Sequence, residues 1–153
     1  MFVERLRRLL PGLWAGGLLC VALLATPAPF AVLASADAGR VVARIFVQEA
    51  WTSLALAVLL LGIERGRART RAAAGHGSVL STDILLLLGV VFFTVAGYFG
   101  VRPLMPAARA GQGWLSFGQL HMASTAFFAA KTICVIALAW RATAAEATPV
   151  PSS

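Results

Sequence analysis

The sequence has few charged residues, and acidic ones are especially scarce. Only 12% of its 153 residues are charged, with six Asp or Glu against thirteen Lys or Arg. Soluble domains carry about 25% charged and about 45–50% apolar residues, whereas this chain is 59% hydrophobic. A soluble fold could not bury that much apolar surface. The composition therefore excludes an ordinary soluble globular domain.

Cysteine and histidine are also scarce, with two of each. Cys20 and Cys134 both lie in apolar segments, which excludes a disulfide framework. The sequence contains no glycine-rich phosphate loop, nucleophile elbow or zinc-binding His-Glu motif. Enzymatic activity stays open, but the sequence favours a non-enzymatic role and offers no catalytic residue.

Four long apolar segments dominate the chain instead. A membrane-spanning helix needs about 20 mostly apolar residues. The segments that qualify are 13–33, 41–63, 80–101 and 115–140. The connections are short, with a flexible turn around His76, and residues 142–153 are predicted to be a disordered tail. The sequence predicts a single all-α membrane domain over residues 1–153, folded as a four-transmembrane-helix bundle.

The first apolar segment has a second interpretation as a secretory signal peptide. Arginines precede it, and Ala34-Ser35-Ala36 after it resembles a signal-peptidase site. Its apolar run is longer than the roughly 7–15 residues typical of a signal peptide. We therefore expect an uncleaved span, with cleavage left open as the alternative.

The arginines cluster at the ends of the apolar segments. A net charge of +7 would suggest nucleic acid in a soluble protein, but no basic face free of membrane remains here, so no nucleic-acid partner is expected. The amino-terminal tail, the connection after the second span and the carboxy end hold eight arginines, against four on the other side. The eight are Arg5, Arg7, Arg8, Arg65, Arg67, Arg69, Arg71 and Arg141, and the four are Arg40, Arg44, Arg102 and Arg109. Because positive charge collects on the cytoplasmic side, both termini are predicted to be cytoplasmic.

Two ionisable residues, His121 and Lys131, lie inside the fourth apolar segment. Such groups are costly in a bilayer and usually face the interior of a bundle. Counting about 1.5 Å per residue from the span centres, Glu49 and Asp83 both lie at depths from which they can reach Lys131. We expect a buried Lys–carboxylate pair that fixes helix register. Snorkelling of Lys131 to the interface and a proton or ion relay are the alternatives.

Polar side chains also predict a second cluster, nearer the outer side. Arg40, Arg44 and Gln48 recur every four residues and so form one stripe on the second span. His121 lies at a similar depth, roughly 10 Å from the middle of the fourth span at about 1.5 Å per residue. We expect Arg44, Gln48 and His121 to face one another, either as a structural tie or as a site for a small ligand or partner.

Pro27 and Pro29 fall in the outer half of the first span. Each removes a backbone N–H, so the helix is expected to bend or unwind there. The carbonyl groups that this frees need a partner at that depth.

His121 is also a candidate ligand for haem or a transition metal, because imidazole binds both. No second histidine lies in a predicted span, as a bis-histidine haem would need. Cys20 and Cys134 fall at similar depth, which would allow a soft Cu(I) pair, although small apolar packing is the simpler interpretation. No cofactor is therefore expected, and haem or copper is the alternative.

Three short motifs resemble a known family. They are TPAPF at 26–30, AGRVVARIF at 38–46 and FGQLHMAS at 117–124. In their order and their positions within four spans they resemble the DUF4149, or TMEM205-like, family of small four-helix membrane proteins, over roughly residues 10–140. That family has no known biochemical function, so the resemblance implies a fold and a location more than an activity. The matching positions are Pro29, Arg40, Arg44, His121 and Ser124.

More remotely, the architecture is similar to the CopD-type copper proteins and the HemJ-type haem-pathway oxidases, which use histidines in small helical bundles. This chain departs from them because it has one intramembrane histidine. Our first hypothesis is a multi-pass protein of a bacterial inner membrane with a binding, scaffold or transport-accessory role. Its partners would be the bilayer and a second copy or another membrane protein. The alternative is a haem- or copper-linked redox or transport protein that uses His121.

Overall fold

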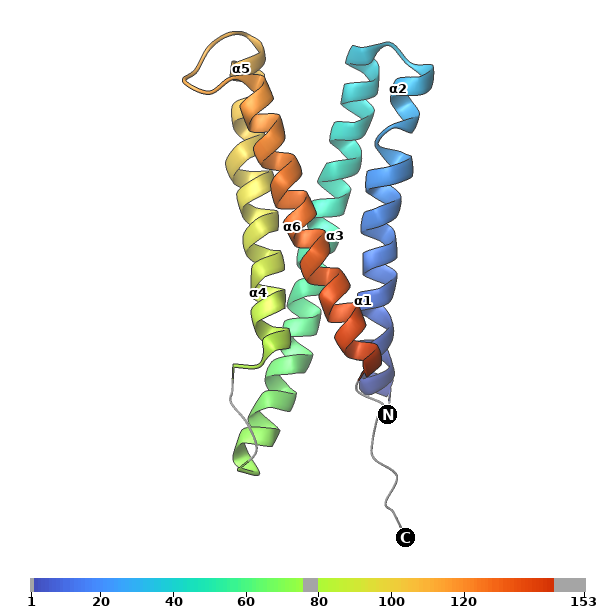
Figure 1. The fold of residues 1–153 in the computed structure, drawn as a ribbon, viewed down its shortest axis with the longest axis vertical. Helices are drawn as coiled ribbons and strands as arrows, with labels where there is room; N and C mark the ends of the chain where they lie inside the picture. The colour runs from blue at the N-terminus through green and yellow to red at the C-terminus, as the bar shows by residue number, and fades with distance from the viewer. Residues whose placement is uncertain (1, 76–79, 145–153) are drawn as a thin grey trace.

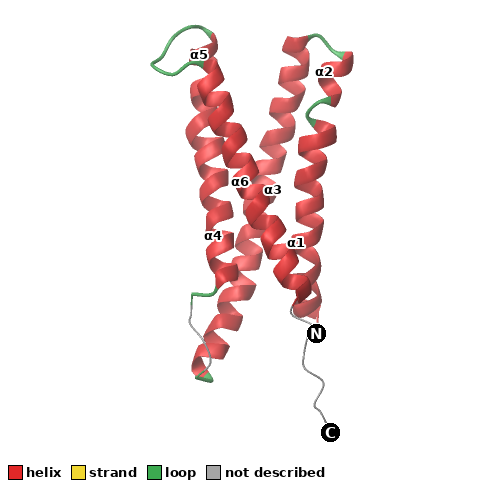
Figure 2. Ribbon diagram, viewed as in Figure 1, coloured by secondary structure: helices red, strands yellow, loops and turns green. Residues whose placement is uncertain are grey.

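The computed structural model describes residues 2–75 and 80–144, and all regular structure in those ranges is helical (Figure 1, Figure 2). Four helical stretches are long and apolar enough to cross a membrane: Phe2–Val32, Ser35–Ala73, Thr82–Arg109 and Phe117–Ala144. They alternate in direction, so the chain enters and leaves at one end of the bundle (Figure 1). This end is called the terminal end below, and the opposite one the far end. The predicted all-α bundle of four spans is thereby confirmed.

The second span is a single helix, α3 (Ser35–Ala73), which is much longer than its apolar segment. The arginine-rich stretch at 65–71, predicted as a connection, forms its last turns. The helix stops where Gly75 adopts a positive φ of 76°, a conformation that glycine takes without a Cβ clash. The predicted turn around His76 lies outside the described residues. So does the predicted tail from residue 145 onward, whereas residues 142–144 are helical.

The first span is interrupted at its far end, as its prolines predict. It consists of α1 (Phe2–Cys20), a π-helical turn η1 (Val21–Ala25) and a short α2 (Ala28–Val32). Pro27 and Pro29 cannot donate backbone hydrogen bonds. One residue before Pro27, Thr26 donates both its backbone N–H and its hydroxyl to the Val21 carbonyl, at 2.9 and 2.7 Å. These two bonds close the π-helical turn just before the prolines.

The third span begins as α4 (Thr82–Thr94), where the Ser81 hydroxyl accepts from the Ile84 N–H at 3.3 Å. It continues through a π-helical turn η2 (Val95–Val101), a 3-10 turn η3 (Arg102–Leu104) and α5 (Met105–Arg109). The fourth span, α6 (Phe117–Ala144), begins after a reciprocal cap. Ser116 and Gln119 each accept the other's backbone N–H there, at 3.2 and 2.9 Å.

The apolar core lies between all four spans. Its buried residues are Trp14, Ala15 and Leu18 of α1, Ala57 and Leu60 of α3, Leu87 and Val90 of α4, and Val135 and Leu138 of α6. Figure 1 shows α3 and α6 running obliquely and crossing near the middle of the bundle, while the two halves diverge toward the far end. The core is therefore concentrated between the crossing and the terminal end.

Candidate functional site

An ion pair joins Lys131 of α6 to Glu49 of α3 inside the bundle. The Lys131 Nζ lies 2.6 Å from the Glu49 Oε1, and the two side chains are 4% and 8% exposed. Asp83, the other acid considered for Lys131, pairs instead with Arg141 at 2.6 Å. Arg141 is ten residues beyond Lys131, about 15 Å along the helix, so Asp83 belongs to a different level of the bundle.

A hydrogen-bond chain extends this pair to a third span. The Ser53 hydroxyl donates to the same Glu49 Oε1 at 2.5 Å, and the Trp14 Nε1–H of α1 donates to the Ser53 Oγ at 3.1 Å. Glu49 and Ser53 are four residues apart, so they lie on one face of α3. The carboxylate therefore holds α1, α3 and α6 together through donors from two directions.

Aromatic side chains cover the ammonium group of this pair. Lys131 Nζ lies 4.8 Å from the centre of the Phe128 ring, close enough for a cation–π attraction. Phe46 of α3 packs edge-on against Phe128, with ring centres 5.4 Å apart. A charge in such an apolar setting is held by its partners, not by water.

Ser53 and Trp14 were not singled out from the sequence. The spacing of Ser53 from Glu49 is a signal that could have found it, since residues four apart share a helix face. Trp14 gave no comparable signal, because a tryptophan near the end of an apolar segment is usually assigned to the membrane interface.

A second charged network lies at the terminal end of the bundle. Glu4 accepts from Arg7 at 2.8 Å and from Arg8 at 3.1 Å, and it also pairs with Arg67 of α3. Arg7 is buried and extends to Glu64, with 3.4 Å between the paired atoms. This network ties the start of α1 to the end of α3. The sequence gave no reason to expect it, because both ends were predicted to be loops.

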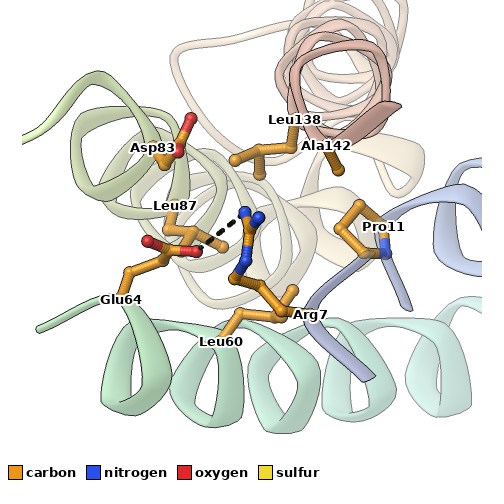
Figure 3. Close-up of a pocket in the computed structure, with 8 residues that line it drawn as sticks. All are labelled: Arg7, Pro11, Leu60, Glu64, Asp83, Leu87, Leu138 and Ala142. Carbon is orange, nitrogen blue, oxygen red and sulfur yellow. Dashed lines mark hydrogen bonds and ion pairs between the residues drawn. The ribbon is translucent and has the colours of Figure 1, made fainter. Parts of the chain in front are cut away.

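Arg7 and Glu64 also face a small, partly open cavity, to which each of the four spans contributes (Figure 3). Its volume is about 10 Å³, room for about one water molecule. Asp83 is the third ionisable group in its wall. The remaining lining residues are Pro11, Leu60, Leu87, Leu138 and Ala142.

The predicted outer cluster does not assemble. Arg40, Arg44 and Gln48 are all exposed, and Arg40 pairs with Asp37 one turn earlier on its own helix. Gln48 and the buried Ala57 are nine residues apart, which at about 100° per residue puts them on opposite sides of α3. The stripe formed by Arg40, Arg44 and Gln48, called the α3 polar stripe below, therefore faces away from the core.

His121 is also exposed, although it lies on the same side of α6 as the buried Val135. The two α6 positions differ because the spans diverge toward the far end. The His121 ring stacks on Phe117 of its own helix, with centres 5.8 Å apart, and makes no hydrogen bond within residues 2–75 and 80–144. Ser124 and Pro29, which the family resemblance added to these residues, are partly buried. Within the described ranges, no hydrogen bond or ion pair joins any two of the six residues Pro29, Arg40, Arg44, Gln48, His121 and Ser124.

The two cysteines, which are the weaker metal candidates, differ in their burial. Cys20 is exposed, and Cys134 is partly buried beside Gly89. In the part of the chain that the structure describes, no three His, Cys, Asp or Glu side chains come together as a metal-binding group.

A family model described as "Domain of unknown function (DUF4149)" matches residues 9–113. The matched range includes Trp14, Glu49 and Ser53 and ends before α6, so Lys131 and His121 lie outside it. No curated protein and no solved structure matches the chain.

Proposed function

This chain belongs to the DUF4149 family, and we propose that it is a non-enzymatic, multi-pass protein of a bacterial inner membrane with a binding or scaffold role. The buried ion pair supports the non-enzymatic part. Lys131 and Glu49 are paired with each other, and the Ser53 hydroxyl donates a hydrogen bond to the same carboxylate oxygen. Groups held in this way fix the crossing of α3 and α6 and are not presented to a substrate.

The observation that carries the binding role is the α3 polar stripe. Gln48 lies inside the apolar segment 41–63, yet its side chain is exposed on the face of α3 away from the core. A primary amide without a partner is costly against lipid, and polar side chains in spans usually bond across helices. We assign the stripe to contact with a second copy of this chain or with another membrane protein.

Site-specific photo-crosslinking in membranes tests this role. A benzoyl-phenylalanine in place of Gln48 is expected to give discrete protein–protein products. The same group in place of Ile133, which is 67% exposed on α6 and apolar, is expected to give lipid adducts. A product with twice the mass of the chain indicates a second copy. Lipid adducts alone at position 48 contradict the proposal.

The second candidate is a haem- or copper-linked protein that uses His121. The exposed ring, with no hydrogen bond in the described ranges, supports it, because a ring nitrogen free to ligate is what such a role needs. Protein purified in mild detergent separates the two candidates by its absorption spectrum and metal content. A Soret band that disappears in His121→Ala, or bound copper lost in the same variant, would favour this candidate over a scaffold.

We further propose that the terminal end faces the cytoplasm, since eight arginines lie there against four at the far end. Reporter fusions after Arg71 and Arg141 are expected to report cytoplasm. Fusions after Gly39 and Gly111 are expected to report periplasm. A periplasmic phosphatase that is active when fused after Arg71 would reverse this orientation.

A further inference from the structure

The terminal end carries more positive charge than its acids can neutralise. Residues 2–8 and 64–71, which lie together there, hold seven arginines and two glutamates. Both glutamates are engaged, Glu4 by three arginines and Glu64 by Arg7 and Arg67. Arg71 is exposed and has no carboxylate partner within residues 2–75 and 80–144. A surplus of unpaired guanidinium groups therefore remains on the last turns of α3.

A groove of about 420 Å³ runs between these turns and the start of α1. Its lining changes in character along α3. Ile63 and Gly66 give it an apolar part where the apolar segment ends, and Arg67, Thr70 and Arg71 give it a polar part beyond, with Val3 of α1 on the facing wall. A Cβ added to Gly66 would meet no atom within 4 Å, so the groove is open at this point. Arg67 and Arg71 are four residues apart and so lie on one face of the helix.

We propose that this groove binds one phospholipid with an anionic headgroup from the surrounding leaflet. Guanidinium groups pair well with phosphate, which places the headgroup beside Arg71 and Arg67. An acyl chain would lie along Ile63 and Gly66, which a free phosphate or a soluble anion could not use. The change from apolar to basic lining occurs where α3 leaves its apolar segment, the level at which headgroups meet juxtamembrane arginines. This inference does not depend on the proposed binding role of the α3 polar stripe.

The test uses the full-length chain in mild detergent, with its thermal unfolding followed as lipid is added. Phosphatidylglycerol is expected to raise the unfolding midpoint in a saturable way. Phosphatidylcholine with the same acyl chains, and soluble glycerol phosphate, are expected to leave it nearly unchanged. Arg71→Gln is expected to weaken the apparent affinity for phosphatidylglycerol by about fivefold, the loss of one arginine near an anionic surface.

Two matched controls distinguish lipid binding in the groove from a general effect of positive charge. Arg69→Gln removes the same charge from an exposed arginine outside the groove and is expected to change the affinity little. Gly66→Leu fills the groove and should weaken binding, whereas Gly62→Leu, one turn away and equally open, should not. Equal losses in Arg69→Gln and Arg71→Gln, an unchanged affinity in Gly66→Leu, or equal stabilisation by phosphatidylcholine or glycerol phosphate would each overturn the proposal.

Discussion

Lys131→Met alone is expected to lower the free energy of unfolding by about 3–5 kcal/mol, because the Glu49 carboxylate is then left buried without its cation. Most of this loss in stability comes from leaving the Glu49 carboxylate buried and unpaired, and less of it comes from losing the attraction between Glu49 and Lys131. Glu49→Gln alone should be destabilising for the same reason, with Lys131 as the stranded group. Unfolding in mixed detergent micelles, followed by tryptophan fluorescence, measures both.

The double variant Glu49→Gln/Lys131→Met should recover most of this loss and lie within about 1 kcal/mol of the wild type. Glutamine keeps an oxygen that can accept from Ser53, so the chain to Trp14 survives. The Asp83–Arg141 pair, whose side chains are 22% and 46% exposed, is the matched control, and breaking it by substitution of the exposed Arg141 should cost at most about 1 kcal/mol. A Lys131→Met protein as stable as the wild type would show that the pair does not hold the bundle together.

Ala57→Leu is expected to destabilise the bundle by about 1–3 kcal/mol through overpacking. Ala57 is 0% exposed and lies in the apolar core, in the same cluster as Trp14, Leu60 and Leu87. Three further carbon atoms at this position would force α3 away from its neighbours, because interiors are close-packed. The same unfolding assay in micelles measures the effect.

Ala55→Leu is the matched control for this substitution. Ala55 lies two residues away on α3 and is exposed, so the added atoms would enter lipid or detergent. Its effect should stay near zero. Equal destabilisation by the two substitutions would mean that the core is not centred where the spans converge.

Several features could be predicted from the sequence because they depend on local composition. The four spans follow from the length of each apolar segment, and the break in the first span follows from the missing N–H groups of Pro27 and Pro29. The depth of Glu49 made it one of two acids within reach of Lys131, because the rise of a helix per residue is nearly constant.

Two features were decided by the tertiary structure alone. One is which acid, Glu49 or Asp83, pairs with Lys131, and the other is what surrounds the α3 polar stripe. Periodicity shows that Arg40, Arg44 and Gln48 share a face, but not which way that face points. Rotation about the helix axis is set by how α3 packs small residues such as Ala57 against its neighbours. Likewise, the divergence of the spans, which leaves His121 exposed, follows from crossing angles between helices. The sequence of one span determines its length and depth, whereas its rotation and tilt depend on side chains from the other three.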